Sequence, residues 1–321
     1  MIESHLSYKY HMTSSIQTPL ALKNHSVVTH SLKRFKKVYI EITNICNLHC
    51  NFCPGTYRPL EVMDEDRFKR ILMAIRPYTD YVFFHLMGEP LLNPNLGSFF
   101  EMSNEAGLKV NITTNGTLLE HAQSSLLKAP AVRQVNISLS SFEANAMTKS
   151  LETYLTTVTE FVKRAVENSG IICAIRLWNI DSALLKGSNR LNEQILYFLE
   201  SHLDLAKGSL PVLSKDRPDV MLKERVYLHL AEKFEWPDLK KTDETHKVFC
   251  HGLRDQMGIL VDGTVVPCCL DSNGNIPLGN LLDTPIEKIL NSERAVALFN
   301  GFSRRNAVEP LCQKCGYARR Y

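Results

Sequence analysis

Short apolar runs rich in β-branched residues alternate with longer amphipathic stretches from Val38 onward. Such runs suit buried strands, and the amphipathic stretches suit helices between them. The pattern predicts six strands: Val38–Thr43, Tyr81–Leu86, Lys109–Thr113, Gln134–Ser138, Ile171–Leu177 and Val226–Leu230. It predicts five helices: Asp64–Ile75, Leu96–Ala106, Leu118–Leu127, Ser150–Glu167 and Leu191–Leu203. This alternation is typical of βα units around a parallel sheet.

The predicted strand–helix units are fewer than the eight of a full barrel, so the expected fold class is α/β, with an open, partial (β/α)6 barrel. Its active site should lie at the C-terminal ends of the strands. Residues 204–249 lack periodicity and are interpreted as a linker around the sixth strand. The expected organisation is an N-terminal arm or cap over 1–36, the barrel over 37–240 and a small C-terminal domain over 241–321.

Composition adds limits on partners and location. The 321 residues are 44% hydrophobic and can bury a large core. A formal charge of +3 is too mild to demand a nucleic-acid partner. No stretch approaches the roughly 18 apolar residues that a membrane span needs, and residues 1–36 lack the apolar centre of a signal peptide. We therefore expect a cytoplasmic protein without a membrane partner, whose thiols stay reduced and available to metals.

Eight of the nine cysteines fall into two groups. Cys46, Cys50 and Cys53 form a CxxxCxxC loop directly after the first predicted strand. Three thiolates leave one iron of a 4Fe-4S cluster open to a substrate or cofactor, whereas four would close the cluster. Structural zinc is the alternative, but zinc needs four ligands, and His49 would be a fourth only by straining the loop. The loop therefore predicts a catalytic iron–sulfur cluster at the mouth of the barrel.

Two further segments follow predicted strands. Met87-Gly88-Glu89-Pro90 comes after the second strand, and Thr114-Asn115-Gly116 after the third. Together with the cysteine loop, in which Phe52 precedes the last cysteine, they resemble the signature of the radical S-adenosylmethionine enzymes. The resemblance spans roughly residues 38–230, with Met87 standing where the family usually has a glycine.

The resemblance implies that Cys46, Cys50 and Cys53 hold a 4Fe-4S cluster whose open iron binds S-adenosylmethionine. An injected electron then breaks a carbon–sulfur bond, and a 5′-deoxyadenosyl radical takes a hydrogen atom from the substrate. By matching positions, the resemblance implies these cofactor contacts: Gly88 and Glu89 to the ammonium group, Phe52 near the adenine, and Ser138 and Arg176 to the ribose hydroxyls and the methionine carboxylate.

Other interpretations of these residues remain open. The alternative role for Glu89 is that of a capping or surface carboxylate. The alternatives for Ser138 and Arg176 are an ordinary serine at a strand end and an arginine that pairs with a nearby acid. His85 is expected to line the cavity rather than to bind iron, because it has no second ligand at metal spacing. No residue stands out as a catalytic acid, base or radical relay.

Five cysteines lie in the last quarter of the chain: Cys250, Cys268, Cys269, Cys312 and Cys315. Together with the run Asp262–Cys268 on a predicted hairpin, they resemble the auxiliary-cluster extension called SPASM. A full extension binds two clusters, and this chain has too few cysteines for that. The resemblance therefore implies one auxiliary 4Fe-4S cluster held by Cys250, Cys268, Cys312 and Cys315, with Cys269 spare.

The sequence thus predicts a radical enzyme with the auxiliary cluster as an electron relay. Among SPASM-bearing relatives the substrates are often peptides or proteins, which are oxidised or crosslinked, and a flavodoxin or ferredoxin would supply the electron. One alternative is radical modification of RNA or a nucleoside, with RNA held by the basic patches at Lys33–Lys37 and Arg319-Arg320. Another is a non-catalytic iron–sulfur redox or sensing protein, against which Gly88-Glu89-Pro90 and Thr114-Asn115-Gly116 argue.

Overall fold

A computed structural model describes residues 35–145, 147–180, 190–210, 219–233 and 235–320. They belong to the second of the two units into which the chain divides, Arg34–Tyr321. The predicted N-terminal arm over 1–36 therefore falls almost wholly outside the described residues and stays a prediction.

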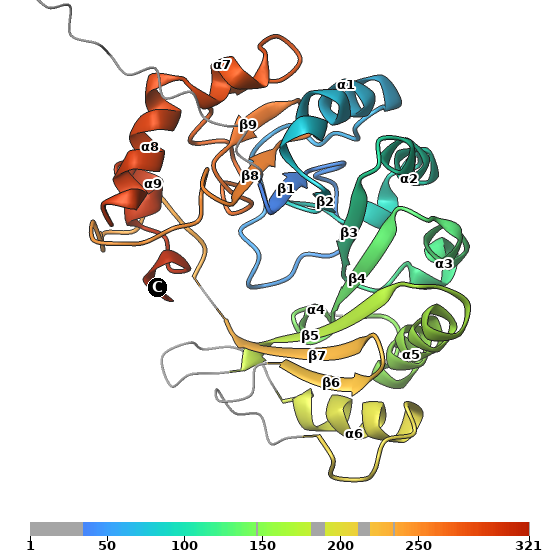
Figure 1. Cartoon of the computed structure of the whole chain (residues 1–321). Helices are drawn as coiled ribbons and strands as arrows, with labels where there is room; N and C mark the ends of the chain where they lie inside the picture. Colours follow the sequence, from blue (N-terminus) through green and yellow to red (C-terminus); the bar gives the residue numbers. More distant parts are fainter. Residues whose placement is uncertain (1–34, 146, 181–189, 211–218, 234, 321) are drawn as a thin grey trace, which may run out of the picture. The chain divides into compact units, whose positions relative to one another are not determined.

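The described strands form one ten-stranded sheet in the order β10-β9-β8-β1-β2-β3-β4-β5-β7-β6. Six neighbouring strands run parallel: β1 (Lys37–Ile40), β2 (Tyr81–Phe84), β3 (Lys109–Thr114), β4 (Val132–Ser138), β5 (Ile172–Ile180) and β7 (Val226–Glu232). The sheet curves without closing, as Figure 1 shows. The predicted fold class, a partial (β/α)6 barrel, is confirmed.

Helices cover the outer face of this curved sheet (Figure 1). The helices on this face are α1 (Glu65–Ile75), α2 (Leu96–Glu105), α3 (Leu119–Lys128), α5 (Leu151–Asn168) and α6 (Asn192–His202), and the 3-10 turn η1 (Arg76–Tyr78) follows α1. The short helix α4 (Ser140–Glu143) and the 3-10 turn η2 (Pro90–Leu92) instead lie in the loops that follow β4 and β2. Side-chain caps begin two of the outer helices: the Asp64 carboxylate accepts from the Arg67 N–H, and the Ser150 hydroxyl from the Thr153 N–H. All five predicted helices are confirmed.

The outer-facing side chains of the strands make the core with these helices. Phe84 of β2 packs edge to face against Phe68 of α1, with ring centroids 5.5 Å apart, and stacks with Phe100 of α2 at 6.0 Å. Phe84 and its neighbours in this layer are essentially inaccessible to solvent. The alternate strand positions, such as Tyr39 and Phe83, therefore face the interior of the barrel.

Residues 204–249 contain more structure than the linker that the sequence predicted. β6 (Asp219–Lys223) lies antiparallel to β7 at the edge of the sheet. None of its side chains is fully buried, so its sequence carries no clear alternation of apolar and polar positions. Backbone pairing with the neighbouring strand, rather than side-chain burial, stabilises such an edge strand, so its hydrophobic pattern does not predict it.

The C-terminal segment continues the same sheet. β8 (Gln256–Ile259) and β9 (Thr264–Val266) form the predicted hairpin, and β10 (Gly279–Asn280) pairs with β9. β8 also pairs in parallel with β1, and no local sequence pattern predicts this pairing. The remaining elements are α7 (Ile286–Leu290), α8 (Glu293–Ser303), α9 (Pro310–Gln313) and η3 (Ala318–Arg320). Among the described residues, no helix is both long and apolar enough to cross a membrane.

Candidate active site and auxiliary cysteine cavity

Cys46, Cys50 and Cys53 lie in the loop that follows β1, at the C-terminal edge of the parallel strands. All three are free thiols; Cys46 and Cys50 are half-buried and Cys53 is exposed. Burial raises the pKa of Cys46 to about 11, and the nearby Glu89 carboxylate and the other two thiols add to the shift. Three thiolates crowded together in this loop therefore need a positively charged partner, which the irons of a cluster provide.

Two asparagine side chains hold the cysteine loop. The Asn145 amide nitrogen donates to Cys50 Sγ at 3.1 Å, and its oxygen accepts from the His49 N–H at 2.8 Å. The Asn115 amide nitrogen lies 4.0 Å from Cys46 Sγ and donates to the Asn47 side-chain oxygen at 2.9 Å. Asn145 could not be recognised from the sequence, because a lone asparagine is not part of any motif with a characteristic spacing.

Gly88 packs against the start of the cysteine loop. Its φ of +76° suits glycine, and an added Cβ would lie 2.5 Å from the Thr43 carbonyl oxygen and 2.8 Å from that of Ile45. The next residue also connects this turn to the cysteine loop, because the Glu89 N–H donates to the Ile45 carbonyl oxygen at 2.8 Å. The turn forms with Met87 in place of the family's glycine, because the Met87 side chain is buried against Leu86 and Val266.

Glu89 connects the motifs that the sequence singled out. Its carboxylate is 2% exposed and accepts from the Leu91 N–H at 3.1 Å and the Asn115 N–H at 2.8 Å. Burial raises the pKa of Glu89 to about 7, although these hydrogen bonds and one from the Thr114 side chain oppose the shift. The carboxylate thus caps the η2 turn, and its hydrogen bonds also hold the Thr114-Asn115-Gly116 segment beside Cys46.

The other predicted cofactor contacts are more dispersed. Phe52 lies within the cysteine loop, with the Lys233 ammonium 5.8 Å from its ring centroid. Ser138 and Arg176 are register partners on β4 and β5. The Arg176 guanidinium stacks over the Trp178 ring at 4.7 Å and lies near Tyr39 and Cys269.

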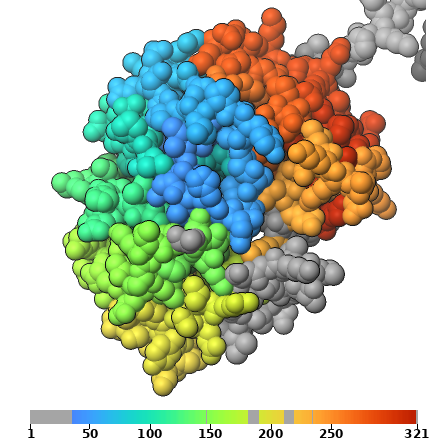
Figure 2. All heavy atoms as spheres, turned by 180° about the vertical axis from the view of Figure 1, so that it is seen from behind, coloured from blue at the N-terminus to red at the C-terminus, as the bar shows by residue number. Residues whose placement is uncertain are grey.

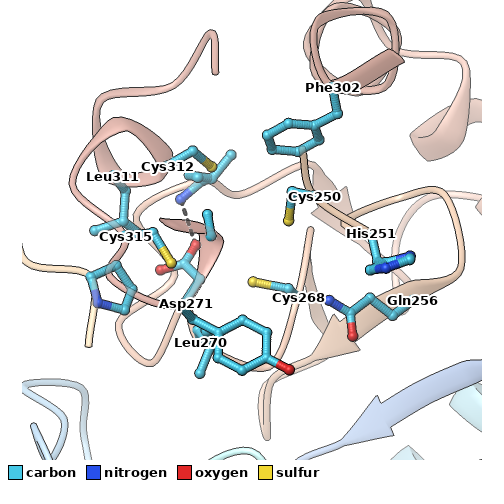
Figure 3. A pocket seen from close by; sticks show the side chains of 14 residues that line it. Cys250, His251, Gln256, Cys268, Leu270, Asp271, Phe302, Leu311, Cys312 and Cys315 are labelled. Atoms are coloured by element: carbon cyan, nitrogen blue, oxygen red, sulfur yellow. Dashed lines mark hydrogen bonds between the residues drawn. The ribbon is translucent and has the colours of Figure 1, made fainter. Parts of the chain in front are cut away.

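The second cysteine group surrounds one cavity. Figure 3 shows the sulfur atoms of Cys250, Cys268, Cys312 and Cys315 turned toward a common space, with Phe302 and Leu311 among the apolar residues around it. Burial raises the pKa of all four thiols, and that of Cys268 and Cys312 lies well above the usual value. Four thiols in an apolar shell match the donor set of a closed 4Fe-4S cluster.

Cys269 does not line this cavity. Its thiol hydrogen-bonds with the Tyr39 side chain on the barrel side. In no part of the described ranges do three His, Cys, Asp or Glu side chains converge on a point that would hold a single metal ion. The thiolates of a 4Fe-4S cluster each bind a different iron, so their sulfurs need no common point of this kind.

Hydrogen bonds connect the segment after the cysteine loop to the C-terminal region. The Arg58 guanidinium donates to the fully buried Glu41 carboxylate at 2.6 Å and to the Ser272 carbonyl at 3.0 Å. The Tyr57 N–H donates to the Asn273 side-chain oxygen at 2.8 Å. Figure 2 shows the blue segments of the barrel against the orange and red C-terminal segments. The two cysteine groups therefore belong to one connected scaffold.

The radical SAM superfamily model matches residues 40–183, which contain the cysteine loop and both segments that contact it. This part of the chain is therefore a radical SAM domain by sequence similarity. The model of the SPASM iron-sulfur cluster-binding domain matches residues 250–316, which contain the second cysteine group. These two domains imply a 4Fe-4S cluster, S-adenosylmethionine and auxiliary iron–sulfur binding.

Curated relatives match part of the barrel. The AdoMet-dependent heme synthase of Methanosarcina barkeri is 31% identical over 111 residues, which are 34% of this chain and 31% of the relative. The GTP 3',8-cyclase of Alkaliphilus oremlandii is 33% identical over 121 residues, which are 34% of this chain and 36% of the relative. The chain thus matches about a third of the length of these relatives.

Solved structures share the fold over most of the chain. BtrN in complex with AdoMet and 2-DOIA has a TM-score of 0.56 at 18% identity, covering 88% of this chain and 93% of that one. Streptococcus suis SuiB bound to precursor peptide SuiA has a TM-score of 0.55 at 16% identity, covering 90% and 71%. At such identities the likeness shows that this chain shares their fold.

Proposed function

We propose that this protein cleaves S-adenosylmethionine reductively at a 4Fe-4S cluster held by Cys46, Cys50 and Cys53, and that the resulting 5′-deoxyadenosyl radical takes a hydrogen atom from a substrate. The observation that carries the proposal is the hydrogen-bonded assembly around Glu89. This buried carboxylate and Gly88 fix the start of the cysteine loop and the Asn115 segment, so a cofactor site would be built from three separate stretches of chain.

For the cofactor itself, the proposed contacts are Gly88 and Glu89 to the ammonium and Phe52 to the adenine. Ser138 and Arg176 are proposed to contact the ribose hydroxyls and the methionine carboxylate. Glu89 suits the first role because its carboxylate lies beside Cys46 and has about four acceptor positions, of which the described hydrogen bonds use three. A bound ammonium would also offset the cost of burying this carboxylate.

We propose one auxiliary 4Fe-4S cluster, held by Cys250, Cys268, Cys312 and Cys315, as an electron relay. Its support is the single cavity that these four thiols line and the position of Cys269 outside it. The contacts of Arg58 with Glu41 and Ser272 keep this cavity and the open cluster loop at a fixed separation. A fixed separation suits electron transfer between two clusters.

The proposed substrate is a peptide or protein, and a flavodoxin or ferredoxin in the cytoplasm would be the electron donor. SuiB, which shares the fold, was solved with a bound precursor peptide. The RNA alternative has less support, because one described basic residue in each patch makes an internal contact. Lys36 pairs with Asp255 at 3.5 Å and Arg319 donates to the Asp243 carbonyl at 3.3 Å, whereas Lys33 and Arg34 lie outside the described residues.

The test is anaerobic reconstitution with iron and sulfide, followed by addition of S-adenosylmethionine and dithionite. We expect about eight irons per chain, the content of two 4Fe-4S clusters, and slow release of 5′-deoxyadenosine. Cys50→Ala should abolish the release. Cys173→Ala, which changes a core thiol buried on β5, is the matched control and should retain it.

Iron binding without cleavage of S-adenosylmethionine would favour the non-catalytic redox or sensing protein. Binding of zinc in place of iron would remove the basis of the proposal.

A further inference from the structure

The three cysteines of the loop after β1 are held in different ways. The Asn145 amide nitrogen donates to Cys50 Sγ at 3.1 Å, and the Asn115 amide nitrogen lies 4.0 Å from Cys46 Sγ. Within the described ranges, the hydrogen bonds of Cys53 instead go to its own loop. The barrel therefore holds two of the three cysteines through side chains and leaves the third to the chain that follows it.

The chain after Cys53 passes through a loosely packed turn. Gly55 has a φ of +65°, and a Cβ added to it would meet no described atom within 4 Å. Cys53 is itself exposed. Few contacts fix a segment of this kind, so its conformation depends on where the chain is next held.

The next residues that are held are Thr56, Tyr57 and Arg58, and their partners lie in the C-terminal region. The Thr56 hydroxyl is within donating distance of the Ser272 carbonyl oxygen, at 3.1 Å, and of the Asn273 side-chain oxygen, at 3.0 Å. The Tyr57 N–H donates to the same Asn273 oxygen at 2.8 Å, and Arg58 Nε donates to the Ser272 carbonyl at 3.0 Å. Two adjacent residues of the C-terminal region thus accept hydrogen bonds from three adjacent residues of the loop segment.

The turn that carries Ser272 and Asn273 is fixed at the wall of the auxiliary cavity. Asp271 precedes it and lines that cavity, as Figure 3 shows. The Asp271 carboxylate is 1% exposed and accepts from the Asn275 N–H and the Ile276 N–H, each at 2.8 Å. These hydrogen bonds close the turn, so its two acceptors have a defined place beside the cavity.

Arg58 also connects this anchor to the parallel sheet. Its guanidinium donates at 2.6 Å to the carboxylate of Glu41, which directly follows β1 and is fully buried. The other Glu41 oxygen accepts from the Val261 N–H at 2.9 Å, between β8 and β9. Removing one partner of a buried ion pair leaves the other charge without compensation, so this contact resists opening.

We propose that Thr56 and Asn273 position Cys53, so that the auxiliary region sets the place of the third cysteine ligand of the loop cluster. Arg58 is the third positioning residue, because its pair with Glu41 holds the same anchor against β1. The three thiolates each bind a different iron, so a displaced Cys53 leaves one iron of the cluster without its protein ligand. The inference rests on the proposed function for identifying the group at the loop as an iron–sulfur cluster.

The test measures the rate at which the reconstituted full-length protein releases iron to the chelator bathophenanthroline disulfonate under anaerobic conditions. Cys46→Ala, which should retain only the auxiliary cluster, identifies the auxiliary part of the release, and the remainder belongs to the loop cluster. Asn273→Ala should accelerate the loop part by about threefold or more, the factor expected when a hydrogen bond that opposes opening is lost. Asn273→Ala combined with Cys46→Ala should leave the auxiliary part unchanged.

A second variant removes the same contact from the other side. Thr56→Val keeps the shape of the side chain without its hydroxyl and should accelerate the loop part to a similar extent. Asn280→Ala is the matched control for Asn273→Ala. The Asn280 side chain donates to the Asp262 carbonyl and accepts from the Leu282 N–H within the C-terminal region, so its loss should leave both parts unchanged.

Arg58→Gln should accelerate the loop part more than Asn273→Ala does, because it also leaves the buried Glu41 without its partner. Arg67→Gln is the matched control. Arg67 likewise donates to a carboxylate, that of Glu61 at 3.1 Å, and to a carbonyl of the C-terminal region, that of Val261 at 2.8 Å. It lies farther along the chain from Cys53, so its loss should not change iron release from the loop.

Unchanged loop release in Asn273→Ala or in Thr56→Val would overturn the proposal. Equal acceleration of the auxiliary part would also overturn it, because the contacts would then stabilise the C-terminal region alone. Absence of loop iron in the wild type would do the same. Faster loop release in these variants of a protein that fails to cleave S-adenosylmethionine would support the positioning role while contradicting the proposed function, so the two failures are distinguishable.

Discussion

The two cysteine groups of this protein differ in how they are assembled. Cys46, Cys50 and Cys53 come from one short loop at the edge of the sheet, and the last of them is exposed. The four thiols of the auxiliary cavity come from residues 250–315 and are surrounded by apolar side chains. An accessible group with three ligands suits ligand exchange at iron, whereas an enclosed group with four suits electron storage.

The difference extends to how each group depends on metal. All four auxiliary cysteines are half-buried, and burial raises the pKa of Cys268 and Cys312 well above the ordinary thiol value, so both thiols stay protonated until a metal replaces their protons. The open loop is held without metal by backbone and amide hydrogen bonds from Asn145 and Glu89. The auxiliary region should therefore depend more strongly on its cluster for folding.

The largest expected effect is a separation of the two groups by mutation. Cys46→Ala should abolish 5′-deoxyadenosine release and leave about four irons per chain, the content of one 4Fe-4S cluster. Cys268→Ala should also leave about four irons but retain release of 5′-deoxyadenosine without substrate. Iron analysis and chromatography of the product measure both.

Cys269→Ala is the matched control for the second change, because it alters the adjacent thiol, which lies outside the cavity. It should keep about eight irons. Loss of the auxiliary iron in Cys269→Ala, and not in Cys268→Ala, would reverse the assignment of the ligand.

The next effect concerns the packing of the open loop. Gly88→Ala should destabilise the protein by about 3 kcal/mol or more, because it combines left-handed backbone strain with contact of its Cβ against the Thr43 carbonyl. Gly97→Ala on α2, whose Cβ would meet no atom within 4 Å, should be neutral or stabilise by about 0.5–1 kcal/mol. Urea unfolding of both variants measures this, and equal stabilities would contradict the described packing.

A smaller effect depends on pH through Glu89. Its folded pKa of about 7 lies above the ordinary value of 4.5, so the folded state favours the protonated form. The stabilising contribution is full below about pH 4.5 and is lost as the pH rises through 7, at up to about 1.4 kcal/mol per pH unit. Urea unfolding of wild type and Glu89→Gln from pH 5.5 to 7.5 isolates this term. A difference that stays constant with pH would contradict it.

The smallest effect is a change in the midpoint potential of the loop cluster that the auxiliary cluster should not share. Asn145→Ala removes an N–H donor to Cys50 and should lower the midpoint potential of the loop cluster by about 40 mV, equivalent to about 1 kcal/mol for one electron. The auxiliary cluster should not shift. A redox titration followed by electron paramagnetic resonance measures both, and equal shifts of the two clusters would count against a local effect.

The structure could be predicted from the sequence where it depends on residues that lie close together along the chain. The strands, helices and open loop are local patterns, and the Gly263-x4-Cys268 spacing selected the cysteine that lines the cavity over Cys269. Pairing of β8 with β1 joins residues more than two hundred positions apart and could not be read locally. The contacts of Asn145 also depend on tertiary packing, so they could not be predicted from the sequence.

The central claim is that only the loop cluster has an iron open to S-adenosylmethionine. Electron paramagnetic resonance of dithionite-reduced Cys268→Ala and Cys46→Ala, each with and without S-adenosylmethionine, tests it directly. The account predicts that the cofactor changes the signal of Cys268→Ala, which retains the loop cluster, and leaves that of Cys46→Ala unchanged. A signal that responds only in Cys46→Ala, or in neither variant, would contradict the claim.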